Sequence, residues 1–371
     1  MSVLGNTAVS FGDEQSMLLD YARSYCADRG GVEAARQRLE EDTEFAPETW
    51  QEIVEMGWTG IGVDEAYGGA GLGIGAAVPV LESMGRALLG TPLMSSLLAA
   101  QLLQRANAVA AADVLNAIVG GDAATVAQLE GEDWGASAAP ATSLEGDAVT
   151  GIKKLVMDGA SARWLVVVAS RGDDTVLAVV DANNLPDGAV NPRVLMDNTH
   201  RAADINFDAV PATLVIDGDA VGSALRDYLL LGALLVAAES AGAAATCLDT
   251  TVDYLKTRKQ FGKLIGSYQA LKHPAVEILS QVDNARSFIY HGATLVDDQA
   301  LSKDAEIACR MAKAQATDTL KFAGDRAVQF HGGMGFTWDC DAQLFLRRAH
   351  WAQQQFGDAQ HHRRRLGDLL L

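Results

Sequence analysis

Cysteine is scarce in this sequence. The four cysteines among 371 residues lie far apart and form no C-x-x-C pair. Neither a zinc site nor a disulfide framework is therefore indicated, and a reducing, cytoplasmic environment fits best. The cysteines are Cys26, Cys247, Cys309 and Cys340.

Basic residues are also few. The chain has 29 Lys and Arg against 48 Asp and Glu, which gives a formal net charge of -19. Because nucleic acids bind to basic surfaces, this charge argues against a nucleic-acid partner. The main basic cluster runs from His361 to Arg365. It is interpreted as the solvated end of a helix, with contact to a phosphate or to a partner's carboxylate as the alternative.

Targeting and membrane-spanning patterns are missing from the sequence as well. The N-terminus lacks a basic region followed by an apolar one, so no secretory signal is predicted. The longest apolar stretch, around Tyr228 to Ala238, stops at Glu239 and is too short to cross a bilayer. We therefore expect a soluble protein without a membrane partner.

The residues that are present favour a largely helical globular protein. Apolar residues make up 49% of the chain, which provides enough material for a buried core and suggests two or three structural units. Three parts follow from the patterns: helices over 1–118, short β-prone runs over 119–218, and helices again over 219–371. A glycine-rich connection at 64–75 suggests a close approach of its backbone to another group. The predicted fold class is α+β, mainly α.

The last part predicts a bundle of four helices. Its first helical pattern starts near Val221 and continues for about forty residues without proline, which corresponds to roughly 60 Å. Three further helical patterns follow at 269–299, 302–330 and 338–371.

Two motifs in this part carry a resemblance. Residues 258–269 read R-x-x-F-G-x-x-I-x-x-x-Q, and residues 329–336 read Q-x-x-G-G-x-G-F. Together with the segment WQEIVEMGWTGIGVDEAYGGAG at 50–71, they resemble the acyl-CoA dehydrogenases over essentially the whole chain. The resemblance implies an N-terminal helical domain, a middle β-domain and a C-terminal four-helix bundle. It also implies FAD as cofactor, an acyl-CoA substrate and an electron-transfer flavoprotein as electron acceptor.

The motifs also assign cofactor contacts. Arg258 carries a permanently charged, planar set of donors that suits the pyrophosphate of FAD, whereas without the motifs it would be interpreted as an ordinary salt bridge at a helix end. In the family these elements extend from one subunit to a flavin held mainly by its neighbour, which implies an oligomer. His331 is assigned to packing or solvent, because the family does not depend on a histidine there. The other residues assigned to the cofactor are Phe261, Gln269, Gln329, Gly332 and Gly333.

The catalytic base that the resemblance implies is missing. Dehydrogenation removes the α-proton and passes the β-hydrogen to the flavin as hydride, so a carboxylate must lie over the α-carbon. The family places this glutamate at one of two positions, which are occupied here by Phe356 and Gly232. Neither residue accepts a proton. Three nearby carboxylates remain as alternatives, Asp227, Glu239 and Asp358, although the first two lie about 7 and 10 Å from Gly232 along the helix axis.

The expected flavin-ring elements also depart from the family. A T-E-P-x-x-G-S-D loop and a W-I-T-N strand usually hold the isoalloxazine ring. Here the corresponding stretches are AQLEGEDWGASAAPATS at 127–143 and GIKKLVMDG at 151–159, and only Gly151 and Lys153 of the second are retained. We therefore expect the chain's own flavin-ring site to be degraded.

These departures favour a partner-type subunit. The chain resembles the subunit without the catalytic base in actinobacterial α2β2 acyl-CoA dehydrogenases that act on steroid side-chain CoA thioesters. A homologous subunit would then supply the glutamate. One alternative is an active homo-oligomer that uses Asp358 or Glu239 as base, and another is a non-enzymatic scaffold or acyl-CoA binding subunit; an oxidase-like relative is a remote option. The bulk of Phe356 also suggests an obstructed cleft.

Overall fold

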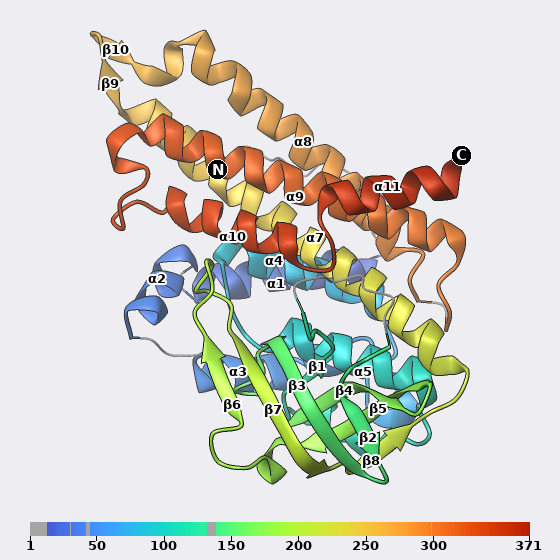
Figure 1. Cartoon of the computed structure of the whole chain (residues 1–371). Coiled ribbons are helices and arrows are strands. Elements are labelled where there is room, and N and C mark those ends of the chain that lie inside the picture. Colours follow the sequence, from blue (N-terminus) through green and yellow to red (C-terminus); the bar gives the residue numbers. More distant parts are fainter. Residues whose placement is uncertain (1–12, 30, 42–44, 132–138, 298) are drawn as a thin grey trace.

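The computed structural model describes residues 13–29, 31–41, 45–131, 139–297 and 299–371. Figure 1 shows three successive parts: a group of N-terminal helices, a β-sheet, and a group of long C-terminal helices. Helix gives way to strand between Val119 and Ala124, and strand gives way to helix between Ile216 and Ala220. This arrangement confirms the predicted fold class, while the exact domain boundaries stay predictions.

The N-terminal part consists of helices joined by short turns. Nearly all residues of α4 and α5 are buried, because these two helices lie in the centre of the protein. The helices are α1 (Asp13–Asp28), α2 (Gly31–Glu41), α3 (Pro47–Glu55), α4 (Ala77–Ala87), α5 (Leu93–Asn107) and α6 (Ala112–Val119).

The middle part is one mainly antiparallel sheet with the order β6-β7-β3-β2-β4-β5-β8, to which β1 adds a parallel pairing with β4. The short β-prone runs predicted over 119–218 do not include β6 and β8, which are only four and three residues long. Pro192 lies within β6, and this is tolerated because β6 is an edge strand. The strands are β1 (Ala124–Ala127), β2 (Ser143–Glu145), β3 (Ala148–Met157), β4 (Trp164–Arg171), β5 (Asp174–Asp181), β6 (Val190–Arg193), β7 (Ala202–Pro211) and β8 (Leu214–Ile216).

The sheet is buried on both faces at its centre. Val166 and Val168 of β4 pack into the core that the helices share, whereas Leu165 and Val167 face a second core inside the β-domain. This division follows from the two-residue period of a strand. It explains why β4 and β5 read as continuous apolar runs.

The C-terminal part is built around α7, which spans 38 residues and is about 57 Å long. By its length and hydropathy α7 could cross a membrane. The sequence did not predict this, because the uninterrupted apolar stretch within it was too short to cross a bilayer. However, 89% of its most apolar window is buried inside the protein, because α4, α5, α8, α9 and α10 pack around it. The helices are α7 (Ala220–Thr257), α8 (Gln269–Ala293), α9 (Lys303–His331), α10 (Ala342–Gln354) and α11 (Ala359–Leu370).

The helical pattern over 338–371 does not form one helix. It is divided into α10 and α11 by a turn in which Phe356 and Gly357 have positive φ angles of 55° and 92°. The Asp358 carboxylate then caps α11 by accepting a hydrogen bond of 2.7 Å from the N–H of His361. Periodicity missed this break because the apolar residues resume the same spacing after it.

The glycine-rich connection at 64–75 approaches another part of the protein. The N–H of Gly75 donates to Asp297 Oδ1 at 3.0 Å, and a Cβ on Gly75 would overlap the carbonyl oxygen of Ala293 at the end of α8. The absence of a side chain at Gly75 therefore lets the chain pack directly on α8.

Helices α4 and α7 also cross at glycines. A Cβ on Gly85 would overlap the carbonyl oxygen of Glu239, and a Cβ on Gly242 would overlap that of Glu82. The two backbones therefore touch without intervening side chains, and this contact sets the separation of the N-terminal and C-terminal helices.

Replacing Gly242 by alanine tests this crossing. We expect Gly242→Ala to destabilise the protein by about 2–3 kcal/mol, because the helices must separate to make room for the methyl group. Gly222→Ala is the matched control in the same helix, since nothing lies within 4 Å of its added Cβ. The control should leave the thermal midpoint unchanged or raise it slightly. Equal midpoints for both variants would contradict the backbone contact.

Candidate functional site

A β-hairpin projects from the end of α7. The helix ends at Thr257 and Arg258 follows it as the C-cap residue; β9 (Lys259–Gln260) then pairs with β10 (Lys263–Leu264). The two residues between these strands, Phe261 and Gly262, have φ angles of 52° and 76°. Two positive φ angles are the requirement of a type I′ hairpin turn, which is unfavourable for a bulky residue. Packing in the core does not compensate for this unfavourable conformation, because the side chain of Phe261 is 88% exposed.

A cleft of about 650 Å³ lies beside this hairpin. Its wall contains four of the residues predicted to contact FAD: Arg258, Phe261, Gly332 and Gly333. A Cβ added to either glycine would meet nothing within 4 Å, so the backbone there is open to a ligand. The cleft is large enough for part of a nucleotide cofactor, and the exposed guanidinium group of Arg258 lies at its edge.

The other two predicted residues lie next to this cleft without forming its wall. Gln269 is the first residue of α8, and its Oε1 is 2.8 Å from His273 Nε2. Gln329 is exposed in the last turn of α9. The structure thus gathers all six residues at one end of the bundle, while their contact with FAD stays a prediction.

Aromatic residues complete the cleft. His331 stacks on Tyr254 with ring centroids 4.2 Å apart, and its Nδ1 donates to the carbonyl oxygen of Ala327 at 2.7 Å. These contacts give His331 a packing role. Tyr254 and Tyr268 also form part of the wall, and neither was predicted from the sequence, although Tyr254 lies one helical turn before Arg258.

The two positions expected for a catalytic glutamate meet in space. A Cβ on Gly232 of α7 would lie 2.5 Å from Cζ of Phe356, which belongs to the turn between α10 and α11. The Phe356 ring is only 4% exposed and packs edge-on against Tyr228 with centroids 5.6 Å apart. The ring therefore occupies the space into which either glutamate would project, and Gly232 leaves that space free.

Buried side chains hold this turn in place. Lys313 Nζ donates to the carbonyl oxygens of Ala352 and Gly357 at 3.0 and 2.7 Å, and His362 Nε2 donates to that of Phe356 at 3.0 Å. Burial lowers the pKa of Lys313 to about 7. Burial, reinforced by the charge of Lys313, lowers the pKa of His362 to about 3.

Little space remains where a flavin ring would be expected. A cavity of about 20 Å³ lies between Phe356, Tyr228 and residues of β1 and β3, and this is room for about one water molecule. Ligand pockets are usually about 300 Å³ or larger. On the other side of Phe356, a cavity of about 460 Å³ is lined by residues of α7, α9 and α11. The cavity between Phe356 and the β-domain is therefore too small for an isoalloxazine ring.

Lys153, the lysine of the β-domain that matches the family's strand pattern, forms a structural ion pair. Lys153 is fully buried, and its Nζ lies 2.6 Å from Glu130 Oε1. Glu130 also accepts hydrogen bonds from the N–H groups of Ala141 and Thr142. Burial alone would raise the pKa of Glu130, but these hydrogen bonds, above all that from Lys153, hold it at about 2. Residues 132–138 of the expected flavin loop lie outside the described residues.

Glu239, one of the alternative bases, is engaged in a buried ion cluster. Its Oε1 lies 2.6 Å from Arg348 Nη1 and 3.2 Å from His200 Nε2. Burial would raise the pKa of Glu239, but the charges of Arg348 and His200 outweigh it and hold that pKa below its ordinary value. A carboxylate held in this way is a poor proton acceptor.

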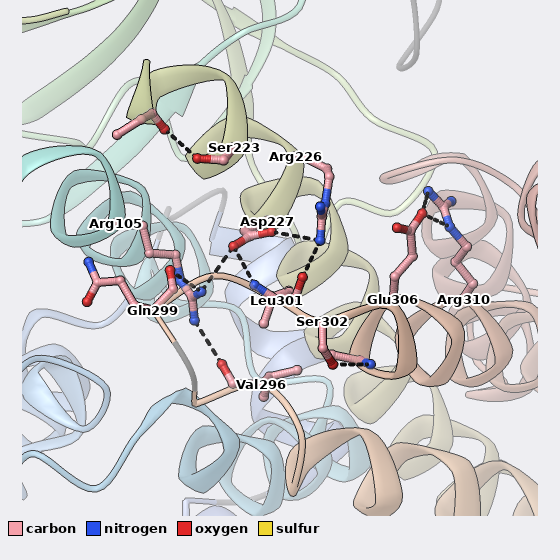
Figure 2. A network of polar contacts seen from close by, with 12 residues as sticks. Arg105, Ser223, Arg226, Asp227, Val296, Gln299, Leu301, Ser302, Glu306 and Arg310 are labelled. Atoms are coloured by element: carbon pink, nitrogen blue, oxygen red, sulfur yellow. Dashed lines mark hydrogen bonds and ion pairs between the residues drawn. The ribbon is translucent and has the colours of Figure 1, made fainter. Parts of the chain in front are cut away.

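Asp227 and Asp358 are engaged as well. Asp227 Oδ2 lies 3.2 Å from Arg105 Nη1 and accepts a hydrogen bond of 3.0 Å from the N–H of Leu301 (Figure 2). Arg105 also donates to the carbonyl oxygen of Val296 at 2.8 Å, so this network joins α5 and α7 to the connection between α8 and α9. Asp358 caps α11. Each of the three alternative bases thus has a structural partner.

The contact between Gly232 and Phe356 can be tested with a double-mutant cycle. We expect Gly232→Ala to lower the thermal midpoint strongly, because its methyl group overlaps the Phe356 ring. In a Phe356→Ala background the same change should have little effect, which gives a coupling energy of about 1–3 kcal/mol. Additive effects of the two substitutions would show that the residues do not touch.

The pH dependence of stability tests the role of His362. Its pKa is about 3 in the folded protein and about 6.5 when exposed, so the unfolded chain binds more protons between these values. Stability should therefore fall by on the order of 3–5 kcal/mol as the pH decreases from about 6.5 to 3. His362→Gln should show a shallower decrease in thermal midpoint over this window, whereas an unchanged slope would contradict the assignment. The exposed His273→Gln serves as the control.

Comparisons with known proteins agree with this architecture. Two family models match the chain: the acyl-CoA dehydrogenase N-terminal domain over residues 12–122 and the acyl-CoA dehydrogenase C-terminal domain over residues 223–371. The chain is 29% identical to the acyl-CoA dehydrogenase IpdE2 of Mycolicibacterium smegmatis over 360 residues, which cover 95% of this chain and 98% of the relative. It is 27% identical to an acyl-CoA dehydrogenase of Bacillus subtilis, with coverage of 91% and 92%.

Solved structures show the same fold. A variant of the Tcur3481–Tcur3483 steroid ACAD superposes with a TM-score of 0.84 at 29% identity, covering 97% of this chain and 98% of that chain. The ChsE4–ChsE5 complex of Mycobacterium tuberculosis gives a TM-score of 0.85 at 23% identity, with coverage of 98% and 99%. The fold, the two family models and the relatives agree, and the chain belongs to the acyl-CoA dehydrogenase family of FAD-dependent oxidoreductases that act on CH–CH bonds.

Proposed function

We propose that this chain is the subunit without the catalytic base in a heteromeric acyl-CoA dehydrogenase. In this proposal a homologous subunit holds FAD and supplies the glutamate, and this chain completes the partner's cofactor site with the hairpin end of its bundle. The substrate is an acyl-CoA thioester and the electron acceptor an electron-transfer flavoprotein. We place the complex, an α2β2 assembly, in the cytoplasm.

The contact between Gly232 and Phe356 carries this proposal. Loss of a glutamate alone would leave an empty cleft, whereas here a buried ring fills the position and a glycine accommodates it. Two residues on separate elements are thus adapted to a closed cleft. The three carboxylates considered as alternative bases, Asp227, Glu239 and Asp358, each have a structural partner, which supports this role.

The opposite end of the bundle supports a role in the partner's site. The exposed Phe261 on a strained turn, the exposed Arg258 and the open backbone at Gly332 have no function within this chain's own core. A scaffold without flavin would have no physical need for this combination. The relative Tcur3481–Tcur3483 is described as a steroid ACAD, which supports a steroid side-chain CoA as the substrate class.

The flavin content of purified proteins tests the proposal. We expect the chain expressed alone to contain almost no FAD and to lack dehydrogenase activity. Co-expression with the homologous subunit encoded nearest to it should give an active complex with about one flavin per pair of chains. Full flavin loading and turnover by the lone chain would falsify the proposed role and favour the homo-oligomer with Asp358 or Glu239 as base.

A second variant pair tests the cofactor contact. In the complex, Arg258→Gln should weaken FAD binding about 10-fold or more, because it removes a charged donor set from the phosphates. Lys256→Gln is the matched control, an exposed cation two residues away that pairs with Asp253. FAD affinity measured by fluorescence should separate the two variants, and equal affinities would remove Arg258 from the cofactor site.

A further inference from the structure

A buried carboxylate on α4 is surrounded by arginines from three helices. Glu82 is 1% exposed, and its Oε1 lies 3.2 Å from Arg286, 3.6 Å from Arg23 and 3.9 Å from Arg86. Its Oε2 accepts a hydrogen bond of 2.6 Å from the hydroxyl of Tyr290. Only Arg286 is within hydrogen-bond distance of the carboxylate, so the other two guanidinium groups are held by longer-range attraction.

Arg23 and Arg86 make only long contacts, of 3.6 to 3.9 Å, with the described carboxylates near them. A second carboxylate of this region, Asp249, lies 3.9 Å from Arg86. The Nε atoms of Arg23 and Arg86 are buried and have no hydrogen-bond acceptor within the described part of the chain. Both side chains are nevertheless partly exposed, 29% for Arg23 and 19% for Arg86, so their guanidinium groups are accessible to an oxyanion that enters from the surface.

A cavity of about 340 Å³ opens at these two arginines. It lies between α1, α2, α4 and α7, and its wall includes Arg23, Arg86 and the hydroxyl-bearing Ser83 and Thr246. The remaining wall is mostly apolar or small and consists of Cys26, Ala27, Gly31, Val32 and Ala87. Thr246 is about 18 Å along α7 from Arg258, so this cavity is separate from the hairpin cleft.

We propose that this cavity is a binding site for a small organic oxyanion. The carboxylate or phosphate group lies between the guanidinium groups of Arg23 and Arg86, which offer paired donors of suitable geometry. A short apolar body of a few carbon atoms packs against Cys26, Val32 and Ala87. The volume of about 340 Å³ suits a ligand of this size and leaves no room for a CoA thioester.

Ligand-induced changes in thermal midpoint test this site in the full chain. Butyrate and butyl phosphate, titrated at constant ionic strength, should raise the midpoint saturably by a few degrees. Neutral butyramide should have no effect, because it lacks the charge. Inorganic phosphate should bind at least several-fold more weakly than butyl phosphate, because it lacks the apolar part. The readout does not depend on flavin or on dehydrogenase activity.

Three variants sharpen the test. Arg86→Gln should abolish the shift, while Arg193→Gln, which changes an exposed arginine of the β-domain, should retain it. Ala27→Leu fills the cavity from an exposed position and should block binding even if Arg86→Gln folds poorly. The proposal is overturned if neither acid gives a saturable shift, if butyramide acts equally, if inorganic phosphate binds as tightly as butyl phosphate, or if the shift survives Ala27→Leu.

Discussion

Helix α7 contacts its neighbours through its own backbone, and the rest of the structure depends on this constraint. At Gly242 it touches α4 without intervening side chains, and at Gly232 it leaves space for the ring of Phe356. The first contact fixes the N-terminal helices against the C-terminal ones. The second closes the position at which the family places its catalytic base. A single long helix therefore determines both the assembly of the fold and the state of the active-site cleft.

Buried charges hold the surrounding elements in register. Arg348 joins α10 to Glu239 of α7, Arg105 joins α5 to Asp227 of α7, and Lys153 joins β3 to Glu130. Since at least one partner of each pair is buried, loss of the other partner would leave a buried charge uncompensated and destabilise the fold. The same pairing disfavours Asp227 and Glu239 as bases, because one oxygen of each carboxylate is bound to a structural arginine.

The two ends of the C-terminal helices differ in character. Near Phe356 the side chains are buried and the turn is fixed by Lys313 and His362, whereas near Phe261 an aromatic ring is exposed on a hairpin in an unfavourable backbone conformation. The buried end near Phe356 and the exposed end near Phe261 agree with the proposed role, in which the chain contributes residues to its neighbour's cofactor site and not to its own. The chain thus combines membership of an enzyme family with a buried phenylalanine at a position where that family is expected to carry its glutamate.

Local sequence patterns predicted the family, the three-part architecture and the positions of the candidate site residues in the chain. The motifs at 258–269 and 329–336 identified the family, and the alternation of helix and strand patterns indicated the three parts. Gly232 and Phe356, at the two positions expected for glutamate, predicted that the usual base is absent. The short strands β6 and β8 escaped detection because three or four residues carry too little periodicity. The break between α10 and α11 escaped because it depends on a backbone turn that apolar spacing does not record. Only the tertiary structure decided that Gly232 and Phe356 touch and that Asp227 and Glu239 are already paired, because contacts between distant segments arise from packing.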